Sequence, residues 1–289
     1  MNTRHLPARS FVANLTFAFA MMSIPWALQA QNAGENLLKN GGAEAGDVSG
    51  WTNFPSTSDT AQDGKKSFVL ATNKTVLSND FIEVDPKARY DLSGYFMVPN
   101  GTAKCYLGFD CYDADKKRIA SQEITTLKGT ETTLSEAAVK GDKVLKIGNG
   151  KSWVYDESWT PQYGCVAINV DDSGACSDLP NRNLTEYGIA AIRQAGAKWE
   201  VELVKPLAMD LPAGTKVREH RAQGNCRWVA SKPVSGQWEQ LKGIVSGIAT
   251  TGQEQGKFFP GTRYIKVNIL SLDATADALV DNVVLRKLE

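Results

Sequence analysis

The sequence predicts an all-β protein whose core is a β-sandwich. Apolar and polar residues alternate in short runs, which is the period of a β-strand, and Gly, Pro, Asn and Asp separate the runs. After residue 30 no long segment has the period of a helix; residues 134–140 come closest to it, and this segment is short. Apolar residues make up 42% of the 289 residues, enough to bury a sizeable core.

The alternation is clearest in residues 104–112. Here the apolar side chains have one parity and most polar ones the other: Cys105, Leu107, Phe109 and Cys111 against Lys104, Tyr106, Gly108 and Asp110. The same period appears in residues 90–98, 198–204 and 264–270. We therefore predict a strand in each of these segments.

The middle of the chain differs from both ends. Short candidate strands follow one another between residues 126 and 225, at 143–147, 165–170, 188–193, 198–204 and 215–221. We predict that residues 126–225 form an inserted small β barrel or sheet domain. Residues 36–125 and 226–289 would then build one discontinuous sandwich of ordinary domain size.

The first thirty residues have the features of a signal peptide. Arg4 and Arg9 precede an apolar run from Phe11 to Trp26, and Ala30 is a small residue suited to cleavage. A membrane anchor is the alternative, but the run is shorter than the roughly 20 residues needed to span a bilayer. We expect a secreted or periplasmic protein without membrane insertion.

Charge and residue counts exclude several classes of function. Lys and Arg total 32 against 32 Asp and Glu, so no net positive charge favours nucleic acid. Of the two His, His5 lies in the expected leader, and His220 alone cannot build a multi-His metal site. His220 alternates with Lys216 and Arg218, which predicts a solvated histidine on a basic strand face.

The five cysteines are Cys105, Cys111, Cys165, Cys176 and Cys226. An odd number leaves at least one free thiol or an intermolecular bridge. Cys105 and Cys111, six residues apart on one strand, would lie about 20 Å apart, too far for a disulfide. Cys165 and Cys176 are either a local disulfide or two reduced thiols.

Four motifs, in order, carry a resemblance to a known family. They are Asn-Leu-Leu-Lys-Asn-Gly-Gly-Ala-Glu at 36–44 with Gly50-Trp51, and the segments 63–68, 112–119 and 278–285. Together they resemble secreted jelly-roll carbohydrate-binding modules of the galactose-binding-like type. The resemblance covers both outer segments, implies a jelly-roll sandwich, and leaves the segment 126–225 without a counterpart.

The resemblance also implies a structural calcium ion, held near Glu44, Lys66 and Asp281 by carboxylate and main-chain oxygens. The first and last strands of a sandwich are commonly neighbours, so Glu44 and Asp281 are expected to approach one another. Two close carboxylates repel unless a cation lies between them. The alternative is a pair of surface carboxylates without a metal.

A sugar-binding surface needs aromatic rings for the C–H face of the sugar and polar groups for its hydroxyls. On a half-buried sheet these groups belong to the parity opposite the core. For each Tyr, a surface cross-strand pair is the alternative role. The candidate ligand contacts are Tyr95, Tyr106, Asp110, Trp228, Lys266 and Asn268. For Trp228, which shares its parity with Cys226 and Ala230, the alternation leaves both faces of the strand open.

A second group of aromatic residues lies in the middle segment. Trp153 and Trp159 flank Tyr155 in a stretch that lacks apolar alternation. These rings form either a second sugar platform or the lid of a small core.

No catalytic fingerprint is present, neither Gly-x-Ser-x-Gly nor His-Glu-x-x-His nor a phosphate loop. Non-catalytic binding of a polysaccharide or oligosaccharide is therefore the first hypothesis, and we name no catalytic residue. A polysaccharide-degrading enzyme, glycosidase or lyase, is the second. A structural or protein-interaction module is the third.

Overall fold

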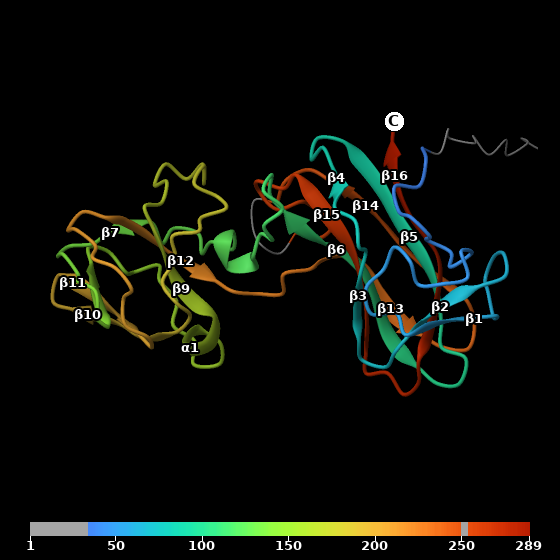
Figure 1. The fold of residues 1–289 in the computed structure, drawn as a ribbon. Helices are drawn as coiled ribbons and strands as arrows, with labels where there is room; N and C mark the ends of the chain where they lie inside the picture. The colour runs from blue at the N-terminus through green and yellow to red at the C-terminus, as the bar shows by residue number, and fades with distance from the viewer. Residues whose placement is uncertain (1–33, 250–253) are drawn as a thin grey trace, which may run out of the picture. The chain divides into compact units, whose positions relative to one another are not determined.

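The computed structural model describes residues 34–249 and 254–289. Antiparallel strands dominate these residues, and their only helical segments are the short α1 (Thr160–Tyr163) and the 3-10 turn η1 (Ser121–Glu123) (Figure 1). The predicted all-β class is confirmed. The expected signal peptide and its cleavage after Ala30 lie outside the described residues. No helix in the described ranges is both long and apolar enough to cross a membrane.

The first large sheet is antiparallel throughout and contains the last strand of the chain. Because the last strand lies between two early strands, the two ends of the described chain meet in one sheet. In spatial order its strands are β1 (Ser56–Ser58), β2 (Ser67–Leu70), β16 (Ala278–Leu288), β5 (Arg89–Met97) and β14 (Glu239–Ser246).

The second large sheet combines strands from both sides of the middle segment. Its order is β13 (Arg227–Val234), β6 (Ala103–Tyr112), β15 (Tyr264–Leu272) and β3 (Thr75–Leu77), with β4 (Ile82–Glu83) also paired to β15. The strands predicted at 90–98, 104–112 and 264–270 are present with bounds shifted by at most two residues.

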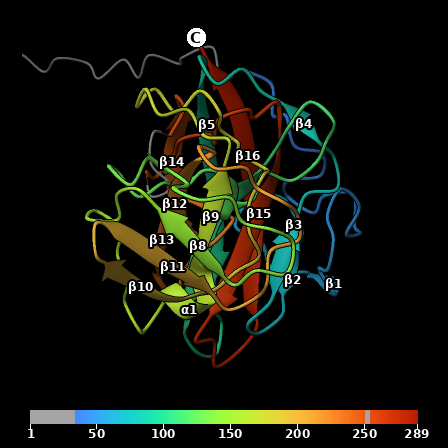
Figure 2. The ribbon, with the colours of Figure 1, turned by 90° about the vertical axis from the view of Figure 1, so that its left-hand side faces the viewer.

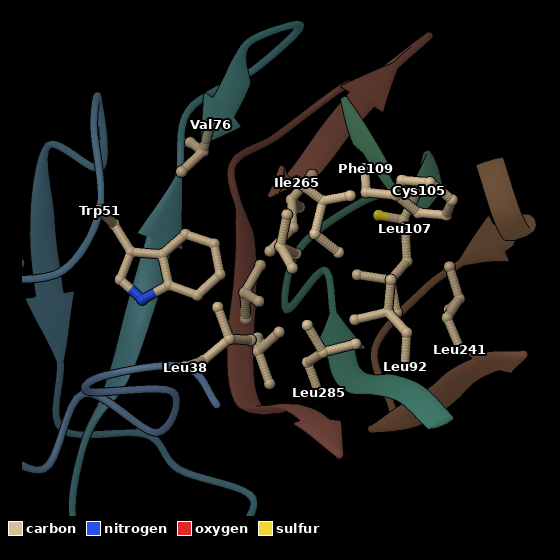
Figure 3. Packing of buried hydrophobic residues seen from close by; sticks show 14 of the residues in the cluster. Leu38, Trp51, Val76, Leu92, Cys105, Leu107, Phe109, Leu241, Ile265 and Leu285 are labelled. Carbon is tan, nitrogen blue, oxygen red and sulfur yellow. The ribbon is translucent and has the colours of Figure 1, made fainter. Parts of the chain in front are cut away.

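The core of the sandwich lies between these two sheets. Leu107 of β6 and Ile265 of β15 are fully buried, as the alternation predicts. Figure 3 shows them pointing into the same space as Leu92 and Leu285 from the first sheet. Burying each such side chain contributes about 1.5–3 kcal/mol. This packing holds the two sheets together. The side chains that alternate with the core residues point away from the core, toward solvent or a ligand.

The middle segment has two three-stranded sheets of its own. One contains β10 (Ile189–Ala195), β11 (Lys198–Leu203) and β8 (Val144–Ile147), which lie side by side in Figure 2. The other contains β7 (Thr132–Thr133), β12 (Lys216–Arg221) and β9 (Gly164–Ile168). Their buried apolar side chains, between Leu134 and Val217, form a separate cluster. That residues 126–225 fold as an independent domain stays a prediction.

All five cysteines are free thiols in the structure. Cys105 and Cys111 are buried in the sandwich core, and burial raises their pKa values to about 12 and about 11. Cys165 and Cys176 are reduced, the second of the two alternatives left by the sequence.

Candidate ligand-binding face

Strand register places five of the six predicted contacts on one surface. Gly108 of β6 stands between Trp228 on one side and Asn268 on the other, while Asp110 faces Lys266. Directly paired residues of an antiparallel sheet point to the same side. These residues, and Tyr106 with them, therefore project away from the core. We call this surface of the second sheet the outer face.

One end of the outer face carries a pair of half-buried rings. The centroids of Tyr106 and Trp228 lie 5.2 Å apart at an interplanar angle of 50°. The absence of a side chain at Gly108 permits this arrangement, since a Cβ there would come within 2.8 Å of Trp228 Cε3 and 2.4 Å of the Arg227 carbonyl oxygen. Lys104 Nζ lies 5.2 Å from the Tyr106 ring centroid. The rings form a platform of the kind sugar C–H faces stack on.

The other end carries a second group of rings around Phe81. Phe81 packs edge-on against Tyr112 at 4.9 Å and against Tyr264 at 6.3 Å, measured between centroids. Lys266 Nζ lies 4.3 Å from the Phe81 centroid and Lys116 Nζ lies 5.4 Å from it. The sequence reasoning missed these rings. Parity could have identified Tyr112 and Tyr264, which alternate with core residues, but Phe81 precedes β4 in a loop and has no such signal.

A hollow adjoins this second ring group. Its volume is about 590 Å³, and Phe81 forms part of its wall. The lining is mostly polar and mixes both signs of charge. It consists of Leu37, Lys39, Asn79, Asp80, Phe81, Ile82, Glu83 and Lys116.

A buried polar cluster lies between the two ring groups. Asp110 is 1% exposed and Asn268 is 4% exposed. Asn268 Nδ2 donates to Asp110 Oδ1 at 3.2 Å, and Arg118 forms an ion pair of 2.7 Å with Asp110 Oδ2. Burial raises the pKa of Asp110, although the Arg118 guanidinium opposes that rise.

This burial corrects one expectation from the sequence. Asp110 and Asn268 have the predicted parity, but neighbouring side chains cover them, so in this structure they stand behind the surface. Asn268 Oδ1 is buried and has no hydrogen-bond partner among the described residues. The amide is thus satisfied at Nδ2, which donates to Asp110, and unsatisfied at Oδ1.

Tyr95 does not belong to the outer face. It lies on β5 of the first sheet, where it pairs with Gln240 and Asp281. The alternation that selected Tyr95 reports only that it points away from the core. It carries no information on which of the two sheets holds it.

Asp281 lies close to the loop at residues 62–66. Its Oδ2 accepts backbone N–H groups from Gln62 at 2.7 Å and Asp63 at 3.1 Å. Burial raises the pKa of Asp281, and the charge of Glu44 adds to this rise. The two carboxylates are therefore near enough to repel.

Glu44 is held by the same loop. Its Oε1 accepts the backbone N–H groups of Lys65 and Lys66, both at 2.9 Å, and these bonds lower its pKa. The Lys66 ammonium instead pairs with Asp59. In the part of the chain that the structure describes, no three His, Cys, Asp or Glu side chains gather as a metal site.

The aromatic residues of the middle segment have different roles. Trp153 is 6% exposed, and its Nε1 donates to the Thr130 carbonyl at 2.8 Å. It belongs to the core, which favours the lid interpretation over the platform. Trp159 stacks against the Arg221 guanidinium at 4.2 Å, whereas Tyr155 is 39% exposed.

His220 is fully buried, so the expectation of a solvated histidine is wrong. Arg218, on the same face of β12, is also buried; it pairs with Asp178 and donates from Nε to His220 Nε2 at 3.0 Å. His220 Nδ1 lies 2.7 Å from the Gln122 carbonyl oxygen. Because a carbonyl only accepts, Nδ1 carries a proton; because the Arg218 N–H only donates, Nε2 carries none. The ring is therefore neutral.

No protein-family model and no curated protein matches the chain. Among solved structures, the CBM22-1 xylan-binding domain of Paenibacillus barcinonensis Xyn10C is 13% identical, with a TM-score of 0.38 over 89% of this chain and 97% of that one. The CBM22-1–CBM22-2 tandem of the same protein is 14% identical, with a TM-score of 0.39 over 91% of this chain and 48% of that one.

The C-terminal family 22 carbohydrate binding module of Clostridium thermocellum Xyn10B is 10% identical, with a TM-score of 0.35 over 86% of this chain and 96% of that one. At such scores the likeness is no evidence of a shared ligand. The chain is similar to solved carbohydrate-binding modules, the class that the motifs of its outer segments resemble.

Proposed function

We propose that this protein binds a polysaccharide or oligosaccharide, without cleaving it, on the outer face of the second sheet. The observation that carries the proposal is the presence of two ring groups, with ammonium groups beside them, on one surface of the second sheet. The Tyr106–Trp228 pair and the Phe81 group offer apolar rings to sugar C–H faces. The ammonium groups of Lys104, Lys116 and Lys266, which lie beside these rings, offer hydrogen bonds to hydroxyls.

The spacing of the rings favours a chain of sugars over a single one. Tyr106 and Tyr112 lie six residues apart on β6, which corresponds to roughly 20 Å at the rise of a strand. A single pyranose ring cannot touch both side chains. An extended glycan lying along β6 reaches both.

A polysaccharide-degrading enzyme is the weaker proposal. Glycosidases of the usual kind need two carboxyl groups roughly 5–10 Å apart on either side of the scissile bond. The carboxyl group at the centre of the outer face, Asp110, is covered and ion-paired with Arg118. It is therefore poorly placed to give or take a proton at a bound sugar.

The test is retention of the purified protein by a panel of soluble glycans in native affinity gels. At least one glycan should retard the wild type, and Trp228→Ala should abolish retardation without lowering the melting temperature. Tyr95→Ala is the matched control, because it removes an equally half-buried ring from the other sheet. Retardation that survives Trp228→Ala and is lost in Tyr95→Ala would place the site elsewhere.

Calcium at the Glu44–Asp281 pair is a separate proposal. Calcium takes six to eight oxygens, and these two side chains supply four, three of which already accept backbone N–H groups. The remaining ligands would be backbone carbonyls and water. The repulsion between the carboxylates supports the proposal, whereas the N–H donors would also hold the loop without an ion.

Export of the protein is proposed on the sequence of residues 1–30 alone. A charged start, an apolar run and Ala30 match a cleavable signal peptide. Cleavage would be read directly from the N-terminal sequence of protein recovered outside the cytoplasm.

A further inference from the structure

Two lysine side chains on the outer face are unbalanced by acid. The ammonium groups of Lys116 and Lys266 both lie near the Phe81 ring, and Lys116 Nζ is also 5.5 Å from the Tyr264 centroid. Within residues 34–249 and 254–289 neither ammonium has an ion-pair partner. Two like charges gathered at one ring repel, and an anion placed between them relieves that repulsion.

The nearby acids do not supply this anion. Asp110 is neutralised by Arg118, and Glu83 pairs with Arg263. Each of these acids is already paired with an arginine, so neither of them offsets the charge of Lys116 or Lys266.

We infer that the ligand of this face is an anionic polysaccharide, whose sugars carry carboxylate or sulfate groups. This inference rests on the proposed glycan binding and narrows its ligand class. A pyranose ring stacked on Phe81 would place a charged substituent at its edge, where the two ammonium groups lie. Ammonium groups bind such anions as point charges with rotatable donors.

The arrangement also predicts how the interaction responds to salt. Lys116 is exposed and Lys266 is half-buried, so both charges are screened in part by mobile ions. Affinity for an anionic chain should fall as ionic strength rises. Affinity that comes only from ring stacking should change little.

The experiment is isothermal titration of the mature protein, from Gln31 onward, with matched hexasaccharides. The first is hexagalacturonate, the second its carboxyl-reduced neutral form, and the third a sulfated, and therefore anionic, derivative of that neutral form. Each is titrated at low and at physiological salt. The variant Lys116→Gln/Lys266→Gln is compared with the control Lys128→Gln/Lys151→Gln, which removes two exposed charges from the middle segment.

We expect a charged hexamer to bind more tightly than its neutral form. The Lys116→Gln/Lys266→Gln variant should lose about fivefold or more of that affinity, a size set by partly exposed charge pairs. The control variant should bind as the wild type does. The carboxylated and sulfated hexamers decide between the two sources of negative charge.

Three results would overturn the inference. Equal affinity for charged and neutral hexamers, with no effect of the lysine changes, would leave glycan binding standing and remove the anionic class. An equal loss in the control variant would show a general polyelectrolyte effect. If neither these hexamers nor any glycan in the gel panel binds, the proposed function itself is removed. Unfolding curves of both variants establish that each is folded.

Discussion

The rings of Tyr106 and Trp228 pack at 5.2 Å although they come from different outer segments of the chain. Tyr106 lies on β6, which ends before the middle segment, and Trp228 lies on β13, which begins after it. A register shift between Trp228 and Ala230 interrupts the regular pairing of these strands next to the ring. The pair is thus a product of the sandwich as a whole.

Removing one ring of this pair should weaken glycan binding without unfolding the protein. An aromatic contact is worth about 0.5–1.5 kcal/mol beyond its buried area, so Tyr106→Ala should reduce affinity about two- to tenfold. Tyr106→Phe keeps the ring and should bind nearly as the wild type does. Titration calorimetry measures both, and an equal loss in the two variants would show that the hydroxyl group matters instead of the ring.

Adding a methyl group at Gly108 should disturb both the strand pairing and the ring platform. The new Cβ would stand 2.4 Å from a backbone oxygen of β13, which cannot move without shifting the strand. Gly108→Ala should therefore lower the free energy of unfolding by about 1–3 kcal/mol and weaken glycan binding. Gly224→Ala, with no heavy atom within 4 Å of its new Cβ, is the control in urea unfolding. Equal stability of the two variants would contradict the contact.

The neighbours Glu219 and His220 should give opposite pH dependences of stability. Burial raises the pKa of Glu219 to about 7, although the backbone N–H of Val154 opposes that rise. Between about pH 4.5 and 7 the folded protein therefore holds a proton on Glu219 that the unfolded chain has lost, so stability falls as pH rises through this range. Burial lowers the pKa of His220 to about 4, so the unfolded chain holds the extra proton between about pH 4 and 6.5 and stability rises with pH. Each effect is on the order of 3 kcal/mol, and the two cancel over most of this range.

The variant Glu219→Gln should expose the histidine effect. It should lose stability on the order of 3 kcal/mol as the pH falls from 6.5 to 4, while the wild type changes little. At pH 8 it should be more stable than the wild type, since a buried charge has gone. Urea unfolding followed by tryptophan fluorescence measures both. A variant that follows the wild type at every pH would contradict the opposed pair.

Calcium, if it occupies the Glu44–Asp281 pair, should stabilise the fold. At an ion concentration of 100 times Kd the stabilisation is about 2.7 kcal/mol, which raises the melting temperature by several degrees. Added calcium should have no such effect on Glu44→Gln. A melting temperature that excess chelator leaves unchanged in the wild type would remove the calcium proposal and leave the N–H donors as the sole support of the carboxylates.

Much of the outer face follows from parity alone. Once residues 104–112 are assigned to a strand, Tyr106 and Asp110 must point away from the side that holds Leu107 and Phe109, and the structure confirms this. Parity cannot tell which of these residues the side chains of other segments cover. Asp110 is outward by parity and yet buried.

His220 shows the same limit in the middle segment. It alternates with Arg218 on a polar strand face, but η1 and the loop holding Asp178 pack on that face and bury both side chains. A basic face can be buried when acids and carbonyl groups from elsewhere meet it. The partners, Asp178 and Gln122, are distant in the sequence, so the local residue pattern does not predict them.

By itself the sequence determined the strand periods and the side of β5, β6 and β15 that enters the sandwich core. Both depend only on the local alternation of apolar and polar residues along a strand. Only the tertiary structure decided that Tyr95 lies on the other sheet and that Phe81 joins Tyr112 and Tyr264. The physical reason is that a surface is assembled from strands and loops far apart in the chain, and its charge and shape exist only once they pack together.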